Sequence, residues 1–254
     1  MRPTRIRDKK MTKVSYLTNV ILSSVIATVL VACDKAPDLS KLEPFRFDEA
    51  NPTIRAQVYK GSEYNSKIST VRAVAEDMSS TGSSQEMITL RAALTGEVVA
   101  TTDWSGGNFT LTLPATIDES KLRDSKDVLL RVFFGPQYAG FEDYYVFGSS
   151  KSYLISLAAY DTEGNYFDDI VLANSNAKDV VDVYFLYAEN NLPIWAYNVP
   201  DTPIKLFRKG WNVVYSADVA MDNLDAVFAY IPTSYLYWIL YRDLGISEAI
   251  DWGK

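Results

Sequence analysis

The side chains that most often carry out chemistry in proteins are unevenly represented in this chain. Its 254 residues include no histidine and a single cysteine, Cys33. The missing imidazole excludes Ser-His-Asp and Cys-His catalysis and histidine-ligated metal sites. One cysteine allows no intrachain disulfide and no multi-cysteine zinc site. The sequence therefore predicts no metal and no cofactor, and it leaves carboxylates as the candidates for catalysis.

Carboxylates gather near two predicted turns. A glycoside hydrolase needs two of them about 5–10 Å apart across a cleft. The chain has 32 acidic residues, however, so clusters arise by chance, and we interpret these as solvated turns. We therefore predict no catalytic residue and keep a carboxylate-based glycosidase as an alternative. The clustered acids are Asp161, Asp168 and Asp169 near one turn, and Asp218, Asp222 and Asp225 near the other.

Cys33 stands at the end of an apolar run. Residues 17–32 are uncharged, and six basic residues and one acidic residue precede them. A membrane-spanning helix needs about 20 residues, so this shorter run indicates a signal peptide instead. The run ends in Leu30-Val31-Ala32-Cys33, which resembles the lipobox of bacterial lipoproteins.

That resemblance implies that residues 1–32 are removed and that a diacylglyceryl group joins the Cys33 thiol. The new amino group can be acylated as well, and two or more acyl chains anchor a protein firmly to a membrane. Without the basic leader the remaining chain carries a net charge of −12. Such a chain repels nucleic acid. The predicted partner is instead a membrane, reached through the lipid on Cys33.

Aromatic residues crowd two loop-like stretches. The chain holds 17 Tyr, 11 Phe and 5 Trp, and these stretches combine aromatic rings with Gly, Pro or Asn. Loops carry many binding residues, and exposed rings stack on sugars or anchor protein partners. We therefore predict binding of a glycan or another envelope protein, with filling of the core as the alternative reading. The predicted binding residues are Phe141, Tyr145, Trp195 and Tyr197.

After residue 53 the chain reads as short strands separated by turns. In residues 108–113, for example, Phe109, Leu111 and Leu113 share one face. Strands at this spacing are typical of antiparallel β-sandwiches, and we expect one short helix, over residues 117–124 with Thr116 as its cap. The predicted strands cover residues 54–59, 70–76, 87–94, 98–102, 108–113, 128–134, 152–160, 166–173, 180–188, 194–198, 211–219, 226–231 and 235–241.

These patterns suggest four segments. Residues 1–32 form the signal peptide, 33–53 a lipidated tether of roughly 25 Å, 54–135 an Ig-like β-sandwich and 136–254 a second β-sandwich. One continuous sandwich is the alternative. The last strand, residues 235–241, is apolar on both faces, which indicates burial on both sides or an edge covered by a partner.

Two stretches carry a further resemblance. Thr102-Asp103-Trp104-Ser105-Gly106-Gly107 followed by Phe109-Thr110-Leu111-Thr112-Leu113-Pro114 is similar to a hairpin of small Ig-like and carboxypeptidase-regulatory-like domains in lipoproteins of the Bacteroidetes. Lys209-Gly210-Trp211-Asn212 resembles a late turn in uncharacterised lipoproteins of that phylum. The resemblance implies a β-sandwich at the outer membrane and no particular activity.

The sequence thus predicts an all-β, lipid-anchored protein of the cell envelope with a non-catalytic binding or accessory role. A glycosidase and a structural subunit of a surface fibre or complex are the alternatives. A flat aromatic surface would favour binding. A cleft with paired acids would favour the enzyme, and an exposed apolar strand edge the structural subunit.

Overall fold

The computed structural model describes residues 38–76, 96–134, 145–177, 180–196, 203–216, 232 and 234–244. In these residues the prediction of an all-β, antiparallel, sandwich-like fold is confirmed. Cys33, Phe141 and Tyr197 lie outside them, as do the predicted strands 87–94 and 226–231. Of the helices in the described part of the chain, none is long and apolar enough to span a bilayer.

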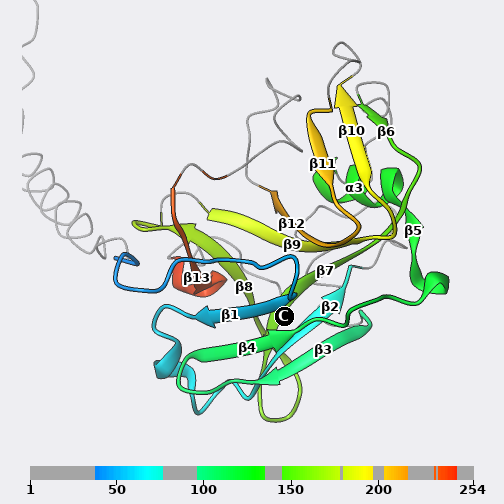
Figure 1. Ribbon diagram of the computed structural model, residues 1–254. Coiled ribbons are helices and arrows are strands. Elements are labelled where there is room, and N and C mark those ends of the chain that lie inside the picture. Colours follow the sequence, from blue (N-terminus) through cyan, green and yellow to red (C-terminus); the bar gives the residue numbers. More distant parts are fainter. Residues whose placement is uncertain are drawn as a thin grey trace, which may run out of the picture. The chain divides into compact units, whose positions relative to one another are not determined.

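A large antiparallel sheet forms the centre of the fold (Figure 1). Strand β8 runs along β7 at its start and along β13 at its end. The first half of β7 pairs directly with the end of β9, and the end of β8 pairs with the start of β9. In order, its strands are β12 (Gly210–Ser216), β9 (Val180–Ala188), β8 (Tyr166–Asn174), β7 (Lys151–Tyr160), β2 (Thr70–Ala75) and β3 (Val98–Asp103), with β13 (Leu236–Leu240) beside β8 and β5 (Arg123–Asp124) beside β7.

One face of this sheet is covered by the pair β1 (Thr53–Gln57) and β4 (Asn108–Thr112). Alternate residues of β4 point inward, so Phe109 and Leu111 are buried while their neighbours are exposed. They meet alternate residues of β7 and β9, among them Ile155 and Phe185, in the largest hydrophobic cluster. This packing makes the sandwich.

The opposite face is covered by helix α3 (Ser125–Phe134) and a small sheet of β6 (Tyr145–Phe147), β10 (Leu192–Ala196) and β11 (Lys205–Phe207). Here the other set of β9 side chains, Tyr184 and Leu186, joins a second hydrophobic cluster. The large sheet is therefore buried on both faces at β9, which explains why this strand reads as an almost continuous apolar run.

The helix lies where a strand was predicted. Residues 128–134 belong to α3, and the predicted helix at 117–124 contains only the 3-10 turn η2 (Glu119–Lys121) and the short β5. Asp118, not Thr116, caps η2 by accepting a hydrogen bond from the Ser120 N–H at 2.8 Å. The Asp124 carboxylate accepts from the Lys126 N–H at 2.9 Å, which satisfies a free donor at the start of α3.

The described residues do not divide into two sandwiches near residue 135. Strand β2 pairs with β7 from Thr70 opposite Tyr160 to Ala75 opposite Ile155, so one sheet includes both predicted halves. The largest cluster likewise takes residues from both. Of the two alternatives, this arrangement matches one continuous sandwich.

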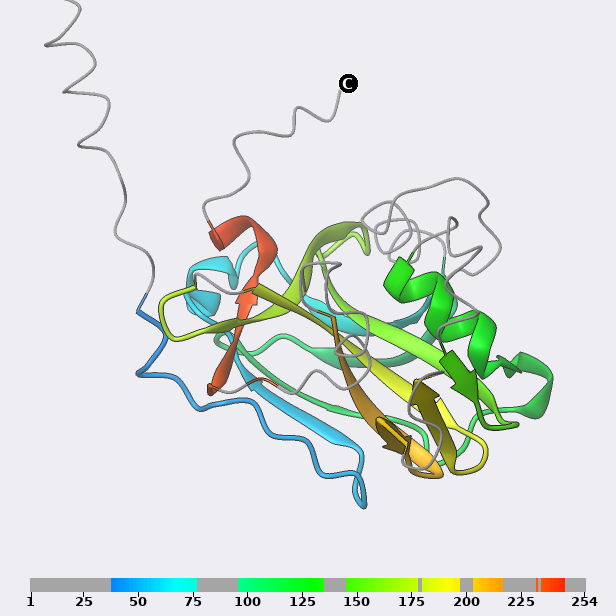
Figure 2. The ribbon, with the colours of Figure 1, turned by 90° about the horizontal axis from the view of Figure 1, so that it is seen from above.

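Residues 38–52, here called the strap, lie along the folded domain, as Figure 2 shows beside β1. Leu39 is fully buried, and its N–H donates to the Ser175 carbonyl at 2.8 Å. The ring centroids of Phe45 and Trp238 are 5.0 Å apart, and those of Phe47 and Phe185 are 5.2 Å apart. The prediction of a free tether through residue 53 is therefore wrong from residue 38 onward, because apolar strap side chains pack into the domain.

The strap also covers the last described strand, β13, which is apolar on both faces. All five residues of β13 are buried. Beside its open edge, the Phe45 N–H donates to the Leu236 carbonyl at 2.7 Å and the Tyr59 N–H donates to the Trp238 carbonyl at 2.9 Å. The 3-10 turns η1 (Gly61–Tyr64) and η5 (Tyr241–Leu244) are joined nearby by a hydrogen bond from the Tyr64 hydroxyl to Asp243. The edge is thus covered by segments of the same chain.

The late Lys-Gly-Trp-Asn turn has a structural explanation. Asn212 is buried, and its side-chain amide donates to the carbonyls of Arg208 and Gly210 at 2.8 and 2.9 Å. Its carbonyl oxygen accepts from the Arg208 N–H at 2.8 Å. Gly210 has a φ of +100°, a left-handed conformation that favours glycine. The motif fixes the turn from β11 into β12.

Candidate functional site

The small sheet presents an apolar surface on the side that faces away from the core. In β10, Trp195 lies opposite Val146 of β6, and Pro193 lies opposite Leu206 of β11. Paired residues of an antiparallel ladder share a face, and so do residues two apart in one strand. Val146, Pro193, Trp195 and Leu206 therefore lie side by side on one face, which we call the outer face.

The two faces of the small sheet differ in the solvent exposure of their side chains. Val146 is 51% exposed and Leu206 is 50% exposed, and Pro193 and Trp195 are partly exposed. On the reverse side Leu192, Ile194 and Phe207 are buried in the second hydrophobic cluster. The outer-face side chains are therefore not part of the second hydrophobic cluster. A cluster of apolar groups left in contact with water is typical of an interaction surface.

Close backbone packing supports the outer face. The Gly148 N–H donates to the Pro193 carbonyl at 2.8 Å. A Cβ atom at Gly148 would lie only 2.7 Å from Pro193 Cδ, so this approach requires glycine. Since the proline ring is itself rigid, β10 is held in place beside the end of β6.

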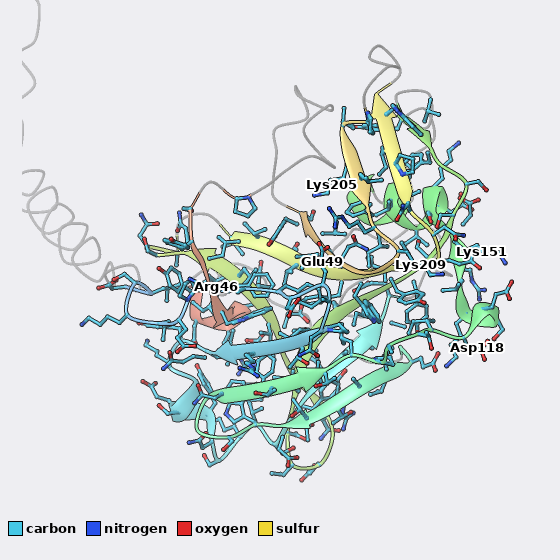
Figure 3. The ribbon with its side chains drawn as sticks, viewed as in Figure 1. Arg46, Glu49, Asp118, Lys151, Lys205 and Lys209 are labelled. Carbon is cyan, nitrogen blue, oxygen red and sulfur yellow. The ribbon has the colours of Figure 1, made fainter. Side chains whose placement is uncertain are left out.

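Lys205 of β11 lies on the reverse side of the small sheet, opposite Ile194. Burial lowers the pKa of Lys205, and the negative charge of Glu49 opposes that shift. The Lys205 ammonium also lies 5.3 Å from the centroid of the Phe207 ring. Figure 3 labels Glu49 on the strap and Lys205 on β11. The strap therefore contributes an opposite charge to the environment of Lys205.

Two of the four predicted binding residues can be assessed. Trp195 is partly exposed on the outer face. Tyr145 is only 3% exposed and packs in the core, since its place in β6 turns its side chain toward the reverse face, so its prediction as a surface residue is wrong. Phe141 and Tyr197 lie outside the described residues.

Sequence reasoning missed Val146 and Leu206. Each is the middle residue of a three-residue strand that was not predicted. The alternation in Tyr145-Val146-Phe147 was a usable signal, because it sends Val146 to the face opposite Tyr145. The pairing of these two strands with β10 was not visible in the sequence.

The acids of β8 do not form a catalytic pair. Asp168 accepts from Arg242 Nε at 3.0 Å and from the Arg242 backbone N–H at 3.1 Å. The Arg242 guanidinium also stacks 3.8 Å from the Phe167 ring centroid. Asp169 follows Asp168 in the strand, so the two carboxylates point to opposite faces of the sheet. Asp218, Asp222 and Asp225 lie outside the described residues.

Burial dominates the electrostatics of Asp169. The pKa of this carboxyl is raised to about 7, mainly by burial and also by the charge of Asp168, while a hydrogen bond with Tyr166 acts in the opposite direction. Asp161 behaves differently: the backbone N–H of Asn165 is the main cause of its lowered pKa. That hydrogen bond closes the β7–β8 turn, which is the structural role expected from the sequence.

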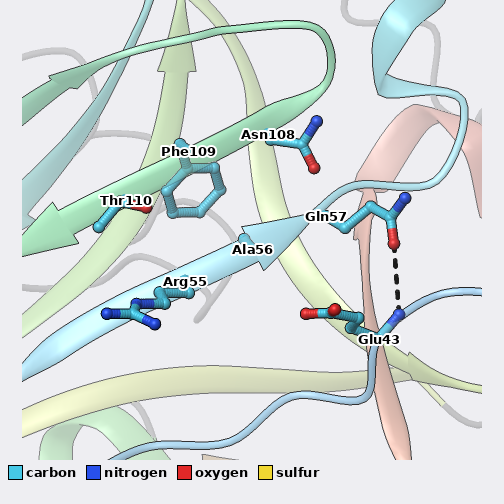
Figure 4. A pocket seen from close by; sticks show the side chains of 7 residues that line it. All are labelled: Glu43, Arg55, Ala56, Gln57, Asn108, Phe109 and Thr110. Carbon is cyan, nitrogen blue, oxygen red and sulfur yellow. Dashed lines mark hydrogen bonds between the residues drawn. The ribbon is translucent and has the colours of Figure 1, made fainter.

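A second feature is a polar recess of about 290 Å³ between the strap and the β1–β4 pair (Figure 4). Its lining includes Arg55 and Glu43, of opposite charge, with the amides of Gln57 and Asn108. Gln57 Oε1 accepts from the Glu43 N–H at 3.3 Å, which joins the strap to β1. This mixed lining does not select a ligand of one charge, and we interpret the recess as a seam beside the strap.

Comparison of the chain with protein-family models, curated proteins and solved structures finds no match.

Proposed function

We propose that this protein is a lipid-anchored protein of the cell envelope, most simply of the outer membrane, that binds another envelope protein through the outer face. The observation that carries the binding role is the placement of Val146, Trp195 and Leu206 on one exposed side of the small sheet. The anchor rests on the Leu30–Cys33 motif after an apolar run.

The composition of the outer face favours a protein over a glycan. Sugar-binding surfaces combine rings with polar groups that hydrogen-bond to hydroxyls, whereas Val146, Pro193 and Leu206 supply only aliphatic contact. Protein interfaces contain a central aromatic residue surrounded by apolar contacts, with tryptophan common among the residues that contribute most. Trp195 would be that central residue, contributing on the order of 2 kcal/mol or more to binding.

The anchor is tested by replacing Cys33 with serine. Cells that express either form are labelled with an alkyne fatty acid and then fractionated. We expect the native chain to take up label and to stay with the membranes, and the Cys33→Ser chain to do neither. Unchanged labelling and membrane retention of the variant would rule out lipid attachment at this cysteine.

The binding surface is tested by photo-crosslinking in cells. A photoreactive phenylalanine analogue is placed at Leu206, and as a control at Val98, which is 45% exposed on β3. We expect one discrete protein adduct at position 206 and none at 98, and we expect Trp195→Ala to abolish it. An adduct that survives Trp195→Ala would contradict the proposal, as would Trp195-dependent binding on a glycan array without any protein adduct.

Stability measurements separate binding from folding. Trp195→Ala should leave the thermal midpoint within a few degrees of the native value, because its ring is only partly buried. The matched control is Trp211→Ala. Trp211 is buried, and its indole N–H donates to the Pro114 carbonyl at 2.7 Å. Truncating it should cost about 3–5 kcal/mol of stability.

A further inference from the structure

The strap begins almost at the proposed lipid anchor. Leu39 is the first buried residue in the described part of the chain, and five residues separate it from Cys33. Even fully extended, the six residue steps from Cys33 to Leu39 span only roughly 20 Å. If Cys33 carries lipid, as proposed above, the site where Leu39 docks cannot lie farther than that from the membrane surface.

Leu39 docks at one end of the large sheet. It packs with Ala173 and Tyr237, and its N–H is bonded to Ser175 in the turn between β8 and β9. Ser175 and Asn176 are exposed in this turn. Residues 174–177 carry no charge, so the turn can approach a lipid surface without the repulsion that the acidic remainder of the chain would meet at anionic headgroups.

The length of strand β9 gives the distance from this turn to the other end of the sheet. Val180 packs beside the Leu39 cluster, and Ala188 lies opposite Gly210 at the far end. Eight residue steps at about 3.3 Å give roughly 26 Å. Strand β10, which carries Trp195, follows β9 beyond that far end, and in both Figure 1 and Figure 2 the small sheet and the start of the strap lie at opposite ends of the domain.

We infer that the turn at residues 174–177, with the adjoining start of the strap, is the surface that rests on the lipid headgroups. The outer face is then directed away from the membrane that holds Cys33. The docked strap replaces a long free tether, so the domain stands in one preferred orientation, and its partner is reached from the aqueous side.

Energy transfer to lipid tests this orientation in the full-length lipidated protein. Because lipidation consumes the natural cysteine, an introduced cysteine is the only free thiol. A donor dye is attached to Ser175→Cys or, as the matched control, to Lys209→Cys; both residues are exposed, and Lys209 adjoins Gly210 at the far end of β9. The proteins are placed in phosphatidylethanolamine–phosphatidylglycerol vesicles with acceptor-labelled headgroups, using a dye pair of short transfer distance.

We expect several-fold more efficient transfer from position 175 than from position 209. Inserting about ten Gly and Ser residues between Lys35 and Ala36 should lower transfer from 175, because the longer chain frees the domain from the surface. Equal transfer from both positions in vesicle-bound protein, or no effect of the insertion, would overturn the orientation. Vesicle binding by a Cys33→Ser protein would instead refute the anchor, so the two failures are distinguishable.

Discussion

Asp169 is the residue whose environment most conflicts with its charge. Burial raises its pKa to about 7, and among the described residues its Oδ1 atom has no hydrogen-bond partner. Asp168, the preceding residue, is buried too, but there Arg242 opposes the effect of burial on its pKa. An acid that meets desolvation without a cation holds its proton in the folded state.

This difference gives stability a pH dependence. The pKa of Asp169 is about 7 when folded and about 4 when unfolded, so the folded state binds more protons between these values. The contribution is therefore fully present below pH 4 and is lost as the pH rises toward 7. We expect Asp169→Asn to raise the thermal midpoint at pH 7 by roughly 5–10 °C and to flatten its decline from pH 5 to 7. The chain has no histidine, so no imidazole titrates in this window.

Asp161→Asn is the control, with the opposite sign. Hydrogen bonds from the Asn165 and Glu163 N–H groups keep the pKa of Asp161 low, so its carboxylate contributes stability above the unfolded pKa. Its replacement should lower the midpoint at pH 7. Calorimetry across this range checks both variants, and a native protein that gains stability from pH 5 to 7 would contradict the assignment of Asp169.

Among the elements, the strap shows how far packing can depart from local pattern. Its charges and prolines give no sustained period, yet Leu39, Phe45 and Phe47 pack into the domain. The short alternation Phe45-Arg46-Phe47 was the available signal, because it turns both rings to one side and Arg46 to solvent.

We expect Phe45→Ala to lower the free energy of unfolding by about 2 kcal/mol. The Phe45 ring meets Trp238 and Phe185 but is only partly buried, so the loss should fall below that for a fully buried ring. Arg46→Ala, at the exposed neighbouring position, should change stability by no more than about 0.5 kcal/mol. Denaturant unfolding measures both, and equal effects would show that the strap contributes nothing specific.

Prediction from sequence succeeded where a segment's own alternation determines its structure. Strand β9 has the bounds that were predicted, because its β-branched and aromatic residues favour a strand on both faces of a buried sheet. It failed at α3, whose apolar run resembles a strand until the cap from Asp124 and the packing of Leu129 and Leu130 are known. For the outer face, composition indicated Trp195, but its neighbours depend on the pairing of three strands distant in sequence.

On the scale of the whole molecule, strands from both halves of the chain lie in one sheet. Strand β7 lies between β2 from the first half and β9 from the second, and the same cluster of side chains includes all three. Neither half contains its own complete core. The described residues should therefore unfold together.

We expect a single thermal transition whose calorimetric and van't Hoff enthalpies agree. A fragment of residues 38–135 lacks β7 and should show no dispersed NMR spectrum, because Val71 and Ala73 would lose their neighbours on that side. The full chain is the matched control. Two resolved transitions, or a folded fragment, would show that the halves are independent.

The contact between the strap and β13 also affects the order in which the protein folds. Phe45 is synthesised long before Trp238, so their contact forms only after all the residues between them have left the ribosome. Pairings of such long range slow folding, because the loop must close before the contact can form. For a chain that crosses a membrane before it folds, as we propose for this one, this delay means that β13 joins the sheet only once all the residues from the strap to Trp238 are across.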